Sequence, residues 1–223
     1  MKHIIFLMIF TLVSPSTVYA WGMPELPVEI PGVGGGGGAD LSSLESSQSA
    51  IADRTKKVLL DFGHAILKFQ AAVTGKEDAD LKELMAKMTD QKVPSDEFIK
   101  RLGSVSDDTT EKIIELQEKG VKLSADASKT FMKGLLPYAK GIFKGGLLTV
   151  DLAAFAPKVT DAIAANPLSA PSALSVALTL IDQIPPMISK FSDANGGIYD
   201  YATFNGIEPP TQDEASSDDD GDD

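Results

Sequence analysis

Cysteine is absent from the 223 residues of the chain, which contain one tryptophan and two histidines. A chain without cysteine forms no disulfide framework and has no thiol nucleophile. His64 is the only histidine beyond the N-terminal segment, so the common zinc sites built from His and Cys ligands are excluded. The G-x-S-x-G, Walker A and H-E-x-x-H motifs are also missing. These absences predict a protein that is not an enzyme and that binds no metal or cofactor.

Two groups of residues keep catalysis open as an alternative. His64, at the flank of a predicted apolar helix face, could act as a general base or metal ligand, although an ordinary interface residue also explains it. The carboxylate pairs 77–78 and 107–108 lie at predicted helix starts, where negative charge complements the helix dipole. A hydrolase that uses carboxylates brought together by folding is therefore a third hypothesis.

Long apolar runs are missing as well, because a membrane-spanning helix needs about 20 apolar residues. The longest candidate, Ile4 to Val13, is a ten-residue run preceded by Lys2 and followed by the small residues Val18 and Ala20. This pattern is typical of a secretory signal peptide. We predict a signal peptide at 1–20 that is cleaved after Ala20, and an exported protein that is periplasmic or secreted.

A segment rich in proline and glycine follows, from Trp21 to residue 39. Its prolines favour an extended chain, and the glycine run after Pro31 favours a flexible tether. We predict that 21–39 is a disordered leader. Extended apolar segments of this kind can dock on a partner. The candidate docking residues are Trp21, Met23, Leu26, Val28 and Ile30.

Negative charge dominates the chain, with a net charge of −12, and it is concentrated at the C-terminus. Residues 208–223 contain eight acidic residues and no basic one. This composition predicts a disordered acidic tail over 205–223. Nucleic acid is not an expected partner, because phosphate contacts need a basic surface.

Helical periodicity covers the region between the leader and the tail. Helix signals include a capping box at Ser42 and Glu45, an N-cap at Ser95, and glycines at 75 and 103 as helix ends. We predict helices at about 42–74, 77–90, 95–103, 106–145, 149–165 and 171–191, with prolines 137, 157, 185 and 186 as kinks or breaks.

The predicted fold is therefore all-α, an antiparallel bundle of five to six helices over 40–204. The segment 197–204, "GIYDYATF", is interpreted as a surface loop or strap whose aromatic rings dock on the bundle.

One basic amphipathic stretch stands out in this acidic chain. Lys129, Lys133, Lys140 and Lys144 share an arc of about 60° on a helix, which makes them a candidate contact for an anionic surface. Glycines in the same stretch, at 134, 141, 145 and 146, offer sites of close approach for a neighbouring helix.

The segments "GVGGGGG", "KFQAAVTGKEDADL", "KGLLPYAKGIFKGG" and "PKVTDAIAANPLSA" occur in this order. In this layout the chain resembles uncharacterised exported all-α proteins of Gram-negative bacteria that carry a glycine-rich stub after the signal peptide. The resemblance implies export and an all-α fold, and it implies no activity.

Two functions are favoured from the sequence. The first is a non-enzymatic interaction or structural protein of the bacterial envelope, with a protein partner. The alternative is a membrane-active or lipid-binding protein that uses the apolar region 129–190, in which charges are sparse.

Overall fold

The computed structural model describes residues 41–88, 90–91 and 93–217. All regular structure in these residues is helical, which confirms the all-α class, although seven helices form instead of five to six. They are α1 (Leu41–Thr74), α2 (Ala79–Met88), α3 (Asp96–Glu118), α4 (Ala125–Ala165), α5 (Ala170–Ala173), α6 (Ser175–Phe204) and α7 (Gln212–Ser216).

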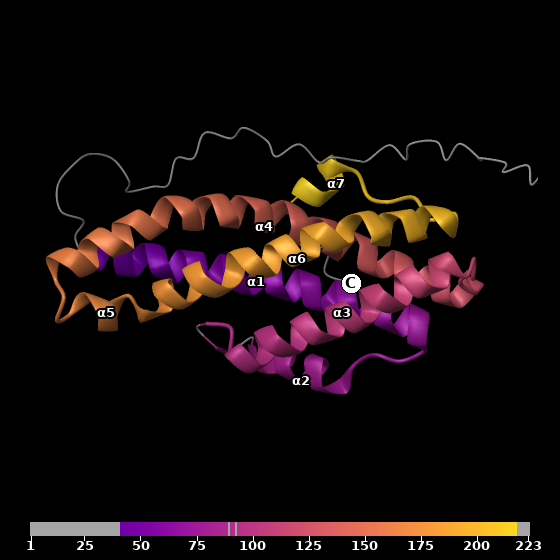
Figure 1. Cartoon of the computed structure of the whole chain (residues 1–223), viewed down its shortest axis with the longest axis horizontal. Coiled ribbons are helices and arrows are strands. Elements are labelled where there is room, and N and C mark those ends of the chain that lie inside the picture. The colour runs from indigo at the N-terminus through magenta and orange to yellow at the C-terminus, as the bar shows by residue number, and fades with distance from the viewer. Residues whose placement is uncertain (1–40, 89, 92, 218–223) are drawn as a thin grey trace, which may run out of the picture.

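The three longest helices, α1, α4 and α6, lie side by side along the long axis of the molecule (Figure 1). Helix α4 runs opposite to both of its neighbours (Figure 1). Helices α2 and α3 cover the side of α1 and α6 away from α4, and α7 lies against α4 (Figure 1). The long helices thus form one elongated bundle.

Of the two predicted ends of α1, only the C-terminal one is correct. Gly75 ends the helix with a φ of 84°, a conformation that glycine adopts without strain. The predicted capping box is wrong, because Ser42 already lies inside the helix that begins at Leu41.

Helix α3 begins as predicted, with the Ser95 side chain accepting a hydrogen bond from the Phe98 amide. Its predicted end at Gly103 is wrong, because the helix continues to Glu118. The turn comes at Gly120, which has a φ of 65°. Gly103 instead faces α6, where its carbonyl oxygen accepts a hydrogen bond from Lys190 at 3.2 Å.

The predicted helices at 106–145 and 149–165 are wrong in their bounds. The chain turns between Lys119 and Ser124, and α4 then runs without a break through Pro137 and Pro157. A proline inside a helix removes one backbone hydrogen bond. Burial of residues all along α4 offsets that loss.

Helix α6 likewise continues through Pro185 and Pro186 to Phe204. The interpretation of 197–204 as a surface loop or strap is therefore wrong. These residues form the last turns of α6, because Ile198, Tyr199 and Tyr201 recur on one helix face and are buried.

The predicted disordered tail at 205–223 is wrong for the part that the structure describes. Thr211 and Glu214 form a reciprocal capping box at the start of α7, and Ala215 in that helix is fully buried. Ile207 in the preceding loop is 4% exposed. Residues 218–223 lie outside the described residues.

The core is closely packed where α1 meets α4. Gly134 and Gly141 of α4 face the rings of Phe69 and Phe62 on α1, and an added Cβ would lie 2.7 and 2.8 Å from them. The predicted close approach at these two glycines is confirmed. Gly145 faces Ile188 of α6, whereas Gly146 faces open space.

Candidate functional site: the outer face of α4

A line of apolar side chains runs along the side of α4 opposite its core face, and we call it the outer stripe. It consists of Met132, Leu136, Phe143, Leu147, Val150 and Ala154. At about 100° per residue, these six positions fall within an arc of about 60°. Exposed fractions are 53% for Met132, 40% for Leu136 and 41% for Val150. Exposed apolar side chains gathered in this way mark a candidate contact surface.

Helix α7 packs on the middle part of α4 (Figure 1). Ala139 points to the same side of α4 by helical geometry, and yet it is 0% exposed. Among the described helices, α7 contacts α4 alone, and its Ala215 is also 0% exposed. Figure 1 shows α7 lying over the middle of α4. A short segment of the chain itself thus already packs on α4.

The four predicted lysines do not share one exposed surface. Lys129 and Lys133 are exposed near the start of α4, but Lys140 is 6% exposed and Lys144 lies 3.9 Å from the carboxylate of Asp61. The anionic-surface contact predicted for all four is therefore wrong for Lys140 and Lys144, because the first is buried and the second lies beside a carboxylate of α1. Only the exposed pair lies next to Met132 and Leu136 in the sequence.

The predicted docking residues Trp21, Met23, Leu26, Val28 and Ile30 lie outside the described residues. So does the predicted signal peptide.

A shallow groove of about 520 Å³ between α3 and α6 is the second candidate. Ile99 and Met187 line it together with Lys100, Asp107, Asp108 and Lys190. The ammonium group of Lys190 contacts the carboxylate of Asp107 at 2.6 Å as well as the Gly103 carbonyl. These contacts tie α3 to α6, so we assign the groove a structural role.

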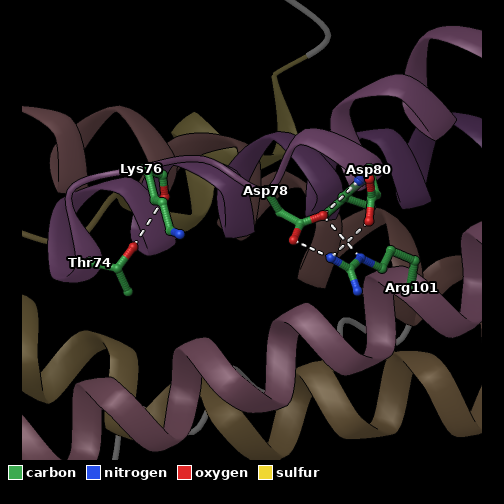
Figure 2. Close-up of polar contacts among 6 residues, drawn as sticks. Thr74, Lys76, Asp78, Asp80 and Arg101 are labelled. Atoms are coloured by element: carbon green, nitrogen blue, oxygen red, sulfur yellow. Dashed lines mark hydrogen bonds and ion pairs between the residues drawn. The ribbon is translucent and has the colours of Figure 1, made fainter.

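A cluster of charges fixes the corner between α1, α2 and α3 (Figure 2). Asp78 caps α2 by accepting a hydrogen bond from the Leu81 amide at 2.8 Å. Arg101 of α3 donates to both carboxylate oxygens of Asp78 and also lies 3.3 Å from Asp80 (Figure 2). Burial raises the pKa of Asp78, but the Arg101 and backbone hydrogen bonds outweigh it and hold that pKa below its ordinary value. The corner therefore stabilises the fold.

The sequence candidates for catalysis are His64 and the two carboxylate pairs. His64 is exposed on α1, where desolvation and the neighbouring Lys68 cation lower its pKa. Glu77 binds Lys68 and Lys82, and Asp107 binds Lys190. Within the described ranges, no group of three or more His, Cys, Asp or Glu residues is arranged to hold a metal ion. Over the same ranges, no helix combines the length and apolarity that crossing a membrane requires.

Comparisons with known proteins return no matching family model, no matching curated protein and no matching solved structure.

Proposed function

We propose that the chain is an exported, non-enzymatic interaction protein of the bacterial envelope, and that the outer stripe of α4 binds a protein partner. Support comes from one observation: Met132, Leu136 and Val150 are exposed on one line of a helix whose opposite side forms the core. Exposed apolar residues gathered on one face are typical of binding surfaces.

The stripe is long and narrow, so it fits an elongated segment better than a compact ligand. Amphipathic helices and extended apolar peptides bind to such surfaces through regularly spaced anchors. Lys129 and Lys133 flank one end, which favours a partner that carries acidic residues at the matching end.

The experiment that tests this role is capture from envelope extracts with the chain from Trp21 onward as bait. A Met132→Glu/Leu136→Glu double variant should lose the captured partner, because it places charge on an apolar surface. Thr160→Glu, at an exposed position of the same helix, should keep it. Circular dichroism checks that all three proteins fold. Equal capture by all three would overturn the assignment of the surface.

An anionic lipid surface is the second candidate. The exposed pair Lys129 and Lys133 next to Met132 and Leu136 favours it, since a lipid surface binds basic and apolar groups together. Flotation with anionic vesicles should fail for Lys129→Glu/Lys133→Glu and persist for Lys158→Glu if this role is correct. Failure of the unaltered chain to float would rule it out.

Export is tested separately. N-terminal sequencing of the protein isolated from the envelope or medium should begin at Trp21, because the cut is expected after Ala20. A protein that retains Met1 would contradict a cleaved signal peptide.

A further inference from the structure

Two ion pairs define the register of α1 against α4, that is, which residues of the two helices lie level with each other. Arg54 contacts Asp151 at 2.5 Å, and Asp61 lies 3.9 Å from Lys144. Each pair lies seven residues from the other on both helices, in opposite directions. Continuing this register brings Leu41 level with residue 164. The chain that precedes α1 therefore leaves the bundle beside the end of α4, a few turns beyond the outer stripe.

The length of that preceding chain matches the stripe. From Ala154 to Met132 the stripe extends about 33 Å, at about 1.5 Å of rise per residue. Residues 21–31, when extended, span about 36 Å at about 3.3 Å each. The nine residues 32–40 can span up to about 30 Å, while the distance along α4 from residue 164 to Ala154 is about 15 Å. The tether is thus long enough to lay the segment on the stripe.

The chemistry of the segment also fits. Five of its eleven residues are Trp, Met, Leu, Val and Ile, and its only charged side chains are Glu25 and Glu29. Apolar side chains of the segment would therefore meet apolar side chains of the stripe. Helix α7 also packs on α4, so this helix already holds one other segment of the chain.

We propose that residues 21–31 dock along the outer stripe of α4 within the same molecule, with Ile30 towards Ala154 and Trp21 towards Met132. The docked segment covers the surface to which a partner binds, so a partner has to displace it. This docking goes beyond the proposed function and does not require that the partner exist.

Trp21 is the only tryptophan of the chain, so its fluorescence reports on this segment alone. In the chain from Trp21 onward, at low concentration and without partner or lipid, its emission should be blue-shifted. Acrylamide should quench it several-fold less than it does in urea. Met132→Glu/Leu136→Glu should restore the emission and quenching of a solvated tryptophan, whereas Thr160→Glu should leave both unchanged. Both variants alter exposed residues, and circular dichroism checks their fold.

Three results would overturn the docking. The first is a Trp21 that is as accessible in the native protein as in urea. The second is shielding that persists in the stripe variant. The third is shielding that appears only at high protein concentration or with anionic vesicles, because this assigns the segment to a second copy or to a lipid surface. None of these readouts uses the envelope partner, so the result is independent of partner capture.

Discussion

The hydroxyl group of Tyr138 on α4 donates a hydrogen bond of 2.5 Å to the backbone carbonyl oxygen of Phe191 on α6. The ring of Phe191 in turn stacks on Phe62 of α1, with centroids 3.9 Å apart. Burial raises the pKa of Tyr138 well above its ordinary value, so the hydroxyl keeps its proton. Two buried contacts of Phe191 thus join the three long helices.

Replacing this tyrosine tests that contact. Tyr138→Phe should lower the free energy of unfolding by about 1 kcal/mol, because the Phe191 carbonyl loses a buried donor while the ring packing remains. Urea unfolding measures the change. Thr160→Ala, at an exposed position of the same helix, should stay within about 0.5 kcal/mol of the unaltered protein. A Tyr138→Phe protein of unchanged stability would contradict the contact.

Two glycines on α4 should respond to alanine in opposite ways. Gly141→Ala should destabilise by about 1–3 kcal/mol, because its Cβ would lie 2.8 Å from the Phe62 ring. Gly146→Ala should stabilise by about 0.5–1 kcal/mol, since its Cβ meets nothing within 4 Å and alanine favours the helix. Thermal unfolding of the two variants compares them directly. The same sign for both would show that the α1–α4 packing is wrong.

The pair Arg54–Asp151 should matter more than its position near the surface suggests. The Asp151 side chain is 11% exposed, so removal of Arg54 leaves a largely buried carboxylate without this cation. Arg54→Ala should cost about 1–3 kcal/mol in the free energy of unfolding. Asp151→Asn in the same protein should recover part of the loss. The exposed Lys57→Ala is the matched control. No recovery in the double variant would contradict the coupling.

Stability should fall in acid because of Glu77 and Asp78. Hydrogen bonds from Lys68 and Lys82 hold the pKa of Glu77 below its ordinary 4.5, and Asp78 also lies below its ordinary 3.8. Lowered values mean that the unfolded chain takes up these protons first, so stability is complete above about pH 5 and declines as pH falls through the folded values. Glu77→Gln should be less stable at neutral pH and show a shallower decline. A decline as steep as that of the unaltered protein would assign the acid sensitivity to other groups.

The packing of α7 can be tested by cysteine labelling, since the chain has no cysteine of its own. Ala215→Cys should react slowly with a thiol reagent, because residue 215 is 0% exposed. Ser216→Cys, at the exposed neighbouring position, should react at the rate of a solvated thiol. Equal rates would show that α7 is detached from α4 in solution.

Local signals predicted the fold class and the helix starts that depend on neighbouring residues. Ser95 caps α3 as expected. The Phe98 amide that donates to its side chain lies only three residues away, so this contact does not depend on distant parts of the chain. Gly103 and Gly120 look alike in sequence, and only the approach of Lys190 from α6 distinguishes the interior glycine from the helix end. The sequence contains the Thr211–Glu214 capping box, but the acidic composition around it predicted disorder instead of a helix.

The prolines and the lysines show a second limit of prediction from sequence, which is that tertiary packing is not visible in it. Pro137, Pro157 and Pro185 predict helix breaks from local chemistry, and packing on both sides of them overrides that preference. The four lysines do share one arc of α4, but a single sequence does not show that Lys140 is buried or that Lys144 lies beside Asp61 of α1. The outer stripe could be found by the same arithmetic once the bounds of α4 are known.

The continuity of α4 through both of its prolines has a mechanical consequence. Its core glycines and its outer stripe share one helical phase, so inserting a single residue in the middle would rotate everything downstream by about 100°. The downstream half of the stripe would then turn away from its upstream half, and Arg54 would lose its alignment with Asp151. A length change in the turn at 119–124 would not rotate the faces of α4, but it would disturb the hydrogen bonds that tie Val121 and Leu123 to Tyr201 and Asn205. The two faces of α4, one towards the core and one outward, therefore fix the number of residues in this helix.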